Sequence, residues 1–472
     1  MHWLDLLIFI FYMIAMLGVG AFFLNKNEST DDYYVGGRSM SKWHVGLSVV
    51  ATDVGGGFSI GLGGLGFTMG ISGSWMLFTG LIGAWLAAVI LIPRLSRLPQ
   101  FKELFTFPQI FGIFYDKKTA LLAGFISAIG YIGFTSSQLL AGAKLASSTF
   151  TGLSLQTALI IMGVIAVVYT VMGGLKAVIY TDTIQWGLLL AGLVFIGIPL
   201  GYVSVGGYEG IVKSLPPEFL SLSNISWQDI VNWGVTIVPI WFVGMTLYQR
   251  IYACKSEKEA QKAWYIAGLF EWPVMAFMGV LLGMFARVGA ESGMFEYLGY
   301  SSASGMDAEI GLPLLLRTIL PAGLMGLMMA AYFSAVLSTA DSCLMAASGN
   351  LVTDIINFKG TDKGKFLRLS QLVTFAIGAF ALILASSMQS VLELMLYSYA
   401  FMVSGLLVPV LGGLFLKKPN PNAAFWSMLF GGGTTITLIL MSTQLPFGLD
   451  ANIFGISISL IVFLVLNQFK SK

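Results

Sequence analysis

The sequence predicts an all-α membrane protein with about thirteen transmembrane helices, and three observations lead to that prediction. Of its 472 residues, 57% are hydrophobic and only 10% are charged, whereas a soluble chain carries roughly 25% charged residues. The hydrophobic residues gather in runs of about 20, the length that crosses a bilayer as a helix. The basic residues fall almost entirely in alternate loops between these runs. We therefore expect a single transmembrane domain over residues 1–472.

The hydrophobic runs define the expected helices in chain order. The first run, 6–24, follows Asp5 rather than a basic residue and has no small-residue cleavage site, so it predicts a retained helix and not a signal peptide. Twelve further runs follow, at residues 43–69, 74–92, 120–150, 155–173, 181–203, 229–252, 264–288, 312–350, 369–387, 391–416, 423–443 and 452–467. The run 312–350 is too long for one straight crossing and predicts a short external helix before the span. The segments 206–228 and 289–311, rich in Gly, Ser and acidic residues, predict external loops with short surface helices.

The basic residues predict the orientation of the chain. With the amino terminus outside, 21 of the 25 Lys and Arg residues, Arg250 among them, fall in cytoplasmic loops. The external side receives Lys213, Arg287 and Arg317, and Lys144 is expected near the outer end of its helix, where a long side chain can snorkel to the interface. Such asymmetry is what the positive-inside rule requires. We expect a multi-pass plasma membrane protein, in the inner membrane if the source is a Gram-negative bacterium, with its carboxy terminus in the cytoplasm.

The order of the runs indicates an internal repeat. When the first helix, 6–24, is set aside, 43–203 and 229–416 each supply five spans that start in opposite orientations, and 423–467 adds two carboxy-terminal helices. Inverted repeats of this kind place a binding site at their interface, near the bilayer midplane. The sequence therefore predicts a five-plus-five inverted repeat with additional helices at both ends.

The stretch 51–61 carries the features of such a site. It places the carboxylate of Asp53 and three consecutive glycines, 55–57, inside the hydrophobic run 43–69. A charged group near the bilayer centre costs about 2.5–3.5 kcal/mol on insertion scales, and helix-breaking backbone at that depth survives only where it lines a cavity or is buried in protein. A broken helix turns its free carbonyls toward a ligand. We therefore interpret this stretch as a binding site.

A second polar cluster lies in the run 312–350. Ala335, Ser338, Thr339 and Ser342 recur at i, i+3, i+4 and i+7 and so share one helix face, with Asp341 at its edge. Hydroxyl and carbonyl oxygens in a dry setting suit a hard cation such as Na⁺. The alternative is that these hydroxyls bond back to the i−4 carbonyl or allow close helix packing. Asp341 favours a functional site, because an intramembrane carboxylate is a functional candidate by default.

Several sequence motifs, taken together, resemble those of the sodium:solute symporter family. They are residues 32–38 (Asp-Tyr-Tyr-Val-Gly-Gly-Arg), 173–185 (Gly-Gly-Leu-Lys-Ala-Val-Ile-Tyr-Thr-Asp-Thr-Ile-Gln), Gln249-Arg250 with 255–262 (Lys-Ser-Glu-Lys-Glu-Ala-Gln-Lys), 335–342 (Ala-Val-Leu-Ser-Thr-Ala-Asp-Ser) and 413–418 (Gly-Leu-Phe-Leu-Lys-Lys). They follow the order of the family from residue 32 to residue 418. The resemblance implies the leucine-transporter fold and alternating access driven by Na⁺.

The resemblance also implies two sodium sites. The common site of the family would fall on the backbone carbonyls of Ala51, Val54 and Ala335 and on the hydroxyls of Ser338 and Thr339. A second site, found in some relatives, would fall on Asp182, Ser338, Asp341 and Ser342. Those relatives commonly have a hydroxyl where this chain has Asp341. In its Thr-Asp-Thr setting, Asp182 is alternatively a helix amino-terminal cap at the cytoplasmic edge.

The resemblance bears on the solute as well. Asp53 matches an aspartate of the proline symporters, whereas glucose symporters have an amide there and choline transporters an aromatic residue. Gly57, Phe58 and Phe401 stand where sugar transporters place polar groups, which disfavours a sugar, since buried hydroxyls need partners. The candidate pocket consists of Asp53, Gly57, Phe58, Trp241, Tyr248 and Phe401, with Tyr399 as a further candidate.

Aromatic faces beside one carboxylate suit an ammonium group, through cation–π attraction and a charge-assisted hydrogen bond. We therefore expect a small amino acid such as proline, or another amine-bearing solute. A choline-like amine, pantothenate and a monocarboxylate remain alternatives. The aromatic residues can also serve ordinary packing, and Asp53 can serve the sodium site alone.

Other functional classes find less support. The only histidines are His2 and His44, the glycine run has no following Lys-Ser/Thr pair of a phosphate loop, and Cys254 and Cys343 are expected to be free thiols, so no enzyme is predicted. The net charge of +2 gives no reason to expect nucleic acid. The expected partners are the solute, Na⁺ and the bilayer, with no obligate protein partner evident. A channel would conduct without solute coupling, and a transporter-derived sensor would need a signalling domain beyond the last hydrophobic run.

Overall fold

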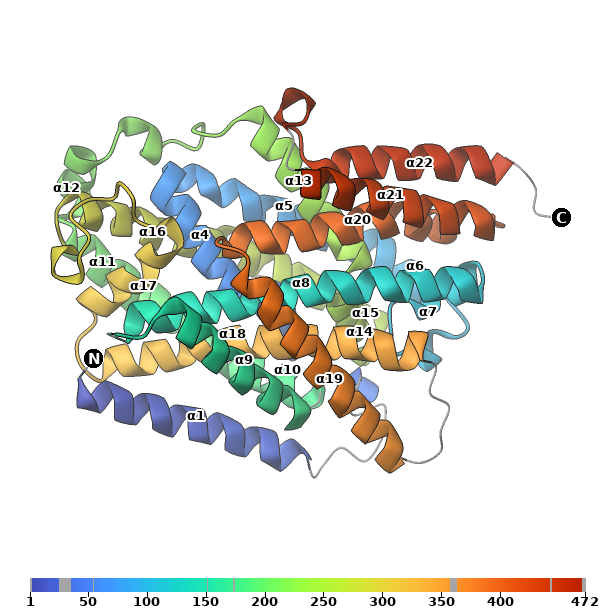
Figure 1. The fold of residues 1–472 in the computed structure, drawn as a ribbon, viewed down its shortest axis with the longest axis horizontal. Coiled ribbons are helices and arrows are strands. Elements are labelled where there is room, and N and C mark those ends of the chain that lie inside the picture. The colour runs from blue at the N-terminus through green and yellow to red at the C-terminus, as the bar shows by residue number, and fades with distance from the viewer. Residues whose placement is uncertain are drawn as a thin grey trace.

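The computed structural model is built from helices that run mostly along one direction (Figure 1). It describes residues 2–24, 35–53, 55–150, 152–172, 175–356, 363–441 and 444–468. Within these ranges no β-strand forms, and one isolated bridge joins Met40 to Cys254. The all-α prediction is therefore confirmed. Val54, and residues 32–34 and 173–174 of the family motifs, lie outside the described ranges.

The helices of the first half of the chain are α1 (Trp3–Leu24), η1 (Gly36–Arg38), α3 (Lys42–Asp53), α4 (Gly55–Met69), η2 (Gly70–Ser74), α5 (Trp75–Leu86), η3 (Ala87–Leu91), α6 (Ile92–Ser96), η4 (Phe101–Glu103), α7 (Gln109–Phe114), α8 (Lys117–Thr149), α9 (Leu155–Met172), α10 (Leu175–Gly192), η5 (Leu193–Gly197), α11 (Ile198–Ser204), α12 (Gly207–Ser214) and η6 (Pro217–Leu220). Those of the second half are α13 (Trp227–Val243), α14 (Met245–Ala253), α15 (Glu257–Leu269), η7 (Phe270–Met275), α16 (Ala276–Glu291), η8 (Glu296–Leu298), α17 (Ala308–Ile319), α18 (Leu324–Gly349), η9 (Asn350–Ile355), α19 (Lys363–Ser386), α20 (Val391–Phe415), α21 (Pro421–Met441), η10 (Pro446–Gly448) and α22 (Ala451–Gln468).

Three of the long hydrophobic runs are interrupted. The run 43–69, in which the sequence predicts a break, divides into α3 and α4 beside residue 54. The run 229–252, predicted as one helix, instead bends by 44° between α13 and α14, because Gly244 leaves the helical conformation at φ −72° and ψ 114°. The run that contains α15 and α16 has a third break at Trp272, with φ −137° and ψ 121°. Residues 312–350 form the expected short helix, α17, ahead of the long α18.

The described residues contain nine helical segments long and apolar enough to cross a membrane, and the bent pair α13 and α14 makes a tenth. Shorter apolar helices lie at Trp3–Met16 and Leu155–Val168. The count of thirteen stays a prediction. α1 begins at the end of the bundle that carries α12 and α17, and α22 runs toward the opposite end, which carries α7 (Figure 1). An odd number of crossings requires this arrangement.

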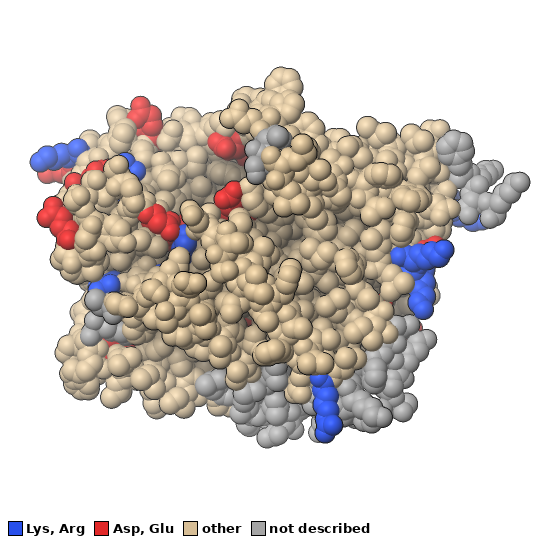
Figure 2. All heavy atoms as spheres, in the orientation of Figure 1, with Lys and Arg blue, Asp and Glu red and all other residues tan. Residues whose placement is uncertain are grey.

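Burial separates inner from outer helices. The most apolar stretch of α18 is 94% buried and that of α20 is 78% buried, whereas the corresponding value is 33% for α19 and 22% for α22. α18 and α20 therefore form the centre, and the faces of α19 and α22 are left for lipid. Charged side chains lie mostly toward the two ends of the molecule, with an uncharged band between them (Figure 2). This pattern is that of a membrane-embedded bundle.

Two basic residues lie elsewhere than predicted. Lys144 does not snorkel: its side chain is buried, and Nζ lies 2.6 Å from both Asp307 Oδ2 and Glu309 Oε2. Arg250 is not a loop residue: it lies in α14 with no exposed surface. Both cations are buried because carboxylates within the protein pair with them, which compensates for the loss of water.

Candidate functional site

The break between α3 and α4 lies directly against α18. Gly55, the first residue of α4, has φ +52°, which glycine adopts without strain. A Cβ at this position would lie 3.0 Å from Thr339 Oγ1 of α18. The glycine therefore lets the broken backbone approach the hydroxyl of Thr339 closely.

Three of the five predicted ligands of the common sodium site meet at this contact. The Thr339 hydroxyl lies 3.0 Å from the carbonyl oxygen of Ala51 and 3.0 Å from that of Ala335. The contact with Ala335 is the bond back to the i−4 carbonyl that the sequence left as an alternative, whereas the contact with Ala51 joins two helices. Carbonyl and hydroxyl oxygens are the donor set that a hard cation prefers. The hydroxyl of Ser338 is instead turned toward Asp182, to which it donates a hydrogen bond. Val54 lies outside the described residues.

Asp182 is the centre of a second cluster. Its Oδ2 accepts a 2.5 Å hydrogen bond from Ser48 Oγ, and Ser338 Oγ donates to its Oδ1. Arg250 Nη2 lies 3.4 Å from Oδ2. Asp182 is fully buried well inside α10, which begins at Leu175, so the alternative of an amino-terminal cap at the membrane edge is wrong. The partners of this carboxylate come from other helices, and not from the first turn of its own.

Arg250 is a site residue that the sequence did not reveal. Its guanidinium donates to Ser48 Oγ at 3.0 Å, Thr52 Oγ1 at 2.5 Å, Ser342 Oγ at 3.2 Å and the Thr246 carbonyl at 3.2 Å. This one side chain joins α3, α14 and α18, and its contact with Asp182 adds α10. Two sequence signals were present, since Gln249-Arg250 belongs to the family motifs and Arg250 lies near the end of a hydrophobic run, but the residue was assigned to a loop.

Asp341 lies beside this network without joining it by a hydrogen bond. Its side chain is fully buried, and neither carboxylate oxygen has a hydrogen-bond partner within the described part of the chain. The Thr170 hydroxyl, which faces it, donates to the Ala166 carbonyl at 2.8 Å. Of the residues predicted for the second sodium site, Asp182, Ser338 and Ser342 thus share one network, and Asp341 brings an unpartnered carboxylate to its edge. An ionised group that is buried in this way is costly unless a cation approaches it.

Asp53 is the carboxylate at the end of α3, and it is 7% exposed. The Tyr399 hydroxyl of α20 donates to its Oδ1 at 3.4 Å. The Phe134 ring of α8 meets the Tyr399 ring edge-on, with centroids 5.1 Å apart. Tyr131 lies next to Phe134, at 6.3 Å between ring centroids. Tyr399 was a candidate from the sequence, whereas Phe134 and Tyr131 were not, because nothing distinguishes them within a hydrophobic run.

The other predicted pocket residues make their described contacts elsewhere. Trp241 packs edge-on against Trp264, with centroids 6.3 Å apart. Tyr248 donates to the Phe242 carbonyl at 2.8 Å and packs on Phe107. Phe401 lies against α21, since its Cε2 would be 3.1 Å from a Cβ at Gly432. Gly57 and Phe58 belong to α4, but their side chains lie outside what is described. A substrate role for these five residues stays a prediction.

Glu271 is a second buried carboxylate of the core, and the sequence analysis missed it. It has no exposed surface, and neither of its oxygens has a hydrogen-bond partner within the described part of the chain. It lies next to the break at Trp272, and a Cβ at Gly80 of α5 would clash with its Oε2. The signal was available: Glu271 is an acidic residue inside the hydrophobic run 264–288, as Asp53 is in its own run.

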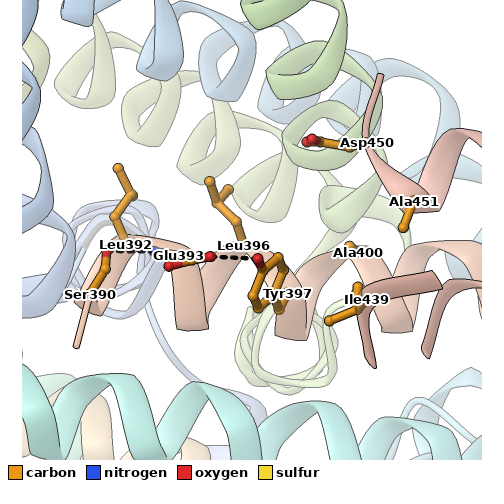
Figure 3. Close-up of a pocket in the computed structure, with 9 residues that line it drawn as sticks. All are labelled: Ser390, Leu392, Glu393, Leu396, Tyr397, Ala400, Ile439, Asp450 and Ala451. Atoms are coloured by element: carbon orange, nitrogen blue, oxygen red, sulfur yellow. Dashed lines mark hydrogen bonds between the residues drawn. The ribbon is translucent and has the colours of Figure 1, made fainter. Parts of the chain in front are cut away.

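An acidic pocket lies at the α17 end of the bundle (Figure 3). It has a volume of about 330 Å³ and is lined by Glu393 and Tyr397 of α20 and by Asp450 before α22. The Tyr397 hydroxyl donates to Glu393 Oε1 at 2.5 Å. Burial, together with the neighbouring Asp229, raises the pKa of Asp450. The nine residues that line the pocket include no Lys or Arg.

Glu309 of α17 closes the bundle at the same end. Its carboxylate accepts hydrogen bonds from Ser390 Oγ at 2.9 Å, Val391 N at 2.9 Å and Leu392 N at 3.0 Å, all at the start of α20. It also accepts from Lys144 Nζ of α8 at 2.6 Å. One carboxylate therefore holds α17 against both α20 and α8.

Comparisons with known proteins find relatives along most of the chain. The sodium:solute symporter family model matches residues 33–431. The sodium/glucose cotransporter of Vibrio parahaemolyticus is 27% identical over 98% of this chain and 90% of its own length. The osmoregulated proline transporter of Bacillus subtilis is 25% identical over 98% and 94%, and the sodium/proline symporter of Escherichia coli 26% identical over 91% and 87%.

Solved structures agree as well. A Na⁺-coupled sialic acid symporter superimposes with a TM-score of 0.80 over 100% of this chain and 98% of its own, at 21% identity. A transporter of the nucleobase-cation-symport-1 family superimposes with a TM-score of 0.60 at 14% identity, over 93% of this chain and 94% of its own. Likeness at these identities shows the fold, which is that of multi-pass membrane transporters. Na⁺ is the co-transported ion, and the chain belongs to the sodium:solute symporter family.

Proposed function

We propose that this protein is a secondary active transporter in which Na⁺ drives the uptake of a small amine-bearing solute, such as proline or another small amino acid, by alternating access. One observation carries the proposal. The Thr339 hydroxyl contacts the carbonyl oxygens of Ala51 and Ala335 at a helix break. Ala51 lies within one helical turn of Asp53, whose carboxylate is buried. Ion ligands and a solute-binding carboxylate thus belong to the same interrupted helix.

The geometry supports coupling between the binding of Na⁺ and the binding of the solute. A Na⁺ ion among these oxygens would bridge the end of α3 to α18 and fix Asp53 beside Tyr399. A solute ammonium on Asp53 would in turn favour the conformation that holds Na⁺, since coupling between two binding sites is reciprocal. The membrane potential adds about 2.3 kcal/mol per charge per 100 mV to the driving force.

The basic residues indicate where the protein lies in the cell and how it is oriented. We place the protein in the plasma membrane with the α17 end outside and the α7 end in the cytoplasm. The support is the distribution of Lys and Arg along the chain. All but five of these 25 residues lie in predicted cytoplasmic loops once Arg250 is counted as buried.

Uptake into proteoliposomes tests the proposal. The labelled panel would contain proline, other amino acids, choline, pantothenate and a monocarboxylate, each with and without an inward Na⁺ gradient. We expect gradient-dependent uptake of an amine-bearing solute. Na⁺ flux without solute coupling would instead identify a channel, and uptake of the monocarboxylate alone would contradict the amine.

The variant Asp53→Asn belongs in the same assay. It keeps the shape of the side chain but removes the charge, so uptake should fall more than Na⁺ binding does. Asp116→Asn is the matched control, because Asp116 caps α8 and Asn caps a helix as well as Asp does. Full uptake by Asp53→Asn would exclude Asp53 as the ammonium partner.

A further inference from the structure

An apolar groove opens on the side of the bundle between α1 and α9. It has a volume of about 430 Å³, and the described residues that line it are all apolar. Its rims are Ile10 and Ile14 of α1 and Ile161 of α9, which are 49%, 61% and 45% exposed. Because α1 and α9 are apolar helices, this opening faces the hydrocarbon of the bilayer, and a lipid chain can enter it.

Three aromatic rings form the floor of the groove. The ring of Phe9, from α1, meets that of Phe333, from α18, edge-on with centroids 5.3 Å apart. It meets the ring of Phe150, at the end of α8, in the same manner at 5.7 Å. The floor is therefore made by packing between helices of the protein, and its shape does not depend on a bound lipid.

A polar pocket adjoins the groove at the α17 end. It has a volume of about 400 Å³. Leu153 lines both spaces, and Ser147 of the pocket follows Ala146 of the groove in α8. Arg317 of α17 and Tyr297 also line the pocket, and none of its described lining residues is Asp or Glu. A cationic side chain thus lies at one end of an apolar groove.

Arg317 is positioned in this pocket by the end of α8. Its Nη1 donates to the Ser148 carbonyl at 2.7 Å. A bond to a neutral carbonyl orients a guanidinium without neutralising it, because the charge stays on the group. The acids at the start of α17, Asp307 and Glu309, are each held by Lys144 Nζ at 2.6 Å. The pocket therefore favours an anion.

We propose that an anionic phospholipid binds at this place, with one acyl chain in the groove between α1 and α9 and its phosphate at Arg317. Arginine matches the oxygens of a phosphate in a bidentate manner. Tyr297 is 64% exposed beside the pocket, and tyrosine is enriched at the level of lipid headgroups. A zwitterionic headgroup would bring its ammonium to a pocket with no carboxylate among its described lining residues.

The lipid site is separate from the sites of the transported solute and of Na⁺. None of the residues that line the groove or the pocket is a predicted ligand of either. The inference therefore goes beyond the proposed function and does not depend on it.

Photocrosslinking in vesicles tests the lipid site. The full-length protein is reconstituted into phosphatidylcholine vesicles with a trace of phosphatidylglycerol that carries a diazirine on one acyl chain. We expect adducts to concentrate on Ile10, Ile14 and Ile161, and an excess of unlabelled phosphatidylglycerol to reduce them about tenfold more than the same excess of phosphatidylethanolamine. Adducts spread evenly over α1, α9, α19 and α22, or equal competition by the two lipids, would overturn the inference.

A soluble competitor separates a lipid from free phosphate. Glycerol 3-phosphate has the anionic group without the acyl chains, so it should leave the labelling unchanged. Competition by glycerol 3-phosphate as strong as that by phosphatidylglycerol would identify a site for free phosphate and overturn the lipid.

Two variants test the two parts of the site. Arg317→Gln removes the charge and should reduce the labelling about tenfold, whereas Arg287→Gln, which removes an exposed arginine paired with Glu291, should not. Ile161→Trp fills the groove and should reduce the labelling as well. Its matched control is Ile160→Trp, since Ile160 is exposed on the same helix outside the groove. Unchanged labelling of Arg317→Gln or of Ile161→Trp would overturn the inference.

A measurement on the unaltered protein guards against a variant that fails to fold. A ligand that binds the folded state raises its thermal transition. In detergent, phosphatidylglycerol should raise the melting temperature more than phosphatidylethanolamine does at the same concentration. An equal rise with both lipids, or no rise with either, would overturn the inference.

Discussion

Thr339 is the side chain at which the broken helix and α18 meet. Because its hydroxyl contacts two of the predicted ligand carbonyls, its removal would take one oxygen from the proposed sodium site and leave both carbonyls without that contact. We expect the double variant Ser338→Ala with Thr339→Ala to raise the Na⁺ concentration for half-maximal uptake by roughly tenfold. Thr339→Ser keeps the hydroxyl and Ser334→Ala lies on the same helix near Met13, so both serve as controls. An unaltered Na⁺ dependence would remove these hydroxyls from the site.

Arg250 and Asp182 form a buried ion pair between two helices. Removing one partner of such a pair leaves the other charge uncompensated and costs about 3–5 kcal/mol. We expect Arg250→Gln and Asp182→Asn each to lower the melting temperature in detergent, and the double variant to lower it by less than the two singles added together. A double-mutant cycle measures this coupling. Strict additivity would show that the two groups do not stabilise one another.

The residues of the site could be predicted to different extents. Ala51, Ala335 and Thr339 followed from the family motifs and from the helical spacing of the hydroxyls, and they lie together. Arg250 was noted as part of a family motif but assigned to a loop, because its partners come from other helices. Glu271 was missed because nothing but its charge distinguishes it within a hydrophobic run. A sequence shows that such a residue is unusual, but only the packed bundle shows which groups face it.

At the scale of elements, α5 shapes the space that Glu271 occupies. A Cβ at Gly80 would clash with Glu271 Oε2, so the carboxylate would have to move to make room for it. We expect Gly80→Ala to displace the Glu271 side chain and to reduce solute uptake severalfold, with smaller effects on Na⁺ binding. Gly187→Ala is the control, because a Cβ there has open space. Normal uptake by Gly80→Ala would show that the position of Glu271 is unimportant.

The helix breaks differ in how visible they are in the sequence. Three consecutive glycines beside Asp53 predicted the division into α3 and α4. The breaks at Gly244 and Trp272 were not predicted, because a lone glycine or proline is tolerated inside a membrane helix and does not by itself show that the helix stops. Tertiary contacts decide such cases. The Tyr131 hydroxyl, for example, accepts a hydrogen bond from the amide of Thr246, which the break at Gly244 has freed.

At the scale of the molecule, backbone contacts join the segment before α3 to the end of α14. Met40 N donates to the Ala253 carbonyl at 3.0 Å, and Lys255 N donates to the Met40 carbonyl at 3.3 Å. Cys254 lies between these contacts, 8% exposed, and burial, with a smaller contribution from Glu259, raises the pKa of its thiol. We expect that thiol to become exposed when these two segments separate.

Alkylation of Cys254 should therefore report opening. In a Cys343→Ala protein we expect slow labelling by a maleimide, which accelerates by about tenfold per pH unit near neutrality because only the thiolate reacts. Na⁺ should slow the reaction further, since an ion between α3 and α18 stabilises the closed arrangement. Equal rates in Na⁺ and K⁺ buffers would contradict this, and Cys254→Ala gives the background.

The order of the helices along the chain was the property that the sequence predicted best. The order of the hydrophobic runs, the short helix before α18 and the surface helices of the long loops all follow from composition and length. The contacts at the two ends could not be predicted, because they join segments more than 200 residues apart, as Met40 and Ala253 do.

Glu309 gives the opposite end a particular manner of opening. Four donors from two helices converge on this one carboxylate. Three of them come from consecutive residues at the start of α20, so any movement of α20 away from α17 breaks all three bonds together. We expect Glu309 to make that separation cooperative, whereas Lys144 of α8 can leave without disturbing the contact with α20.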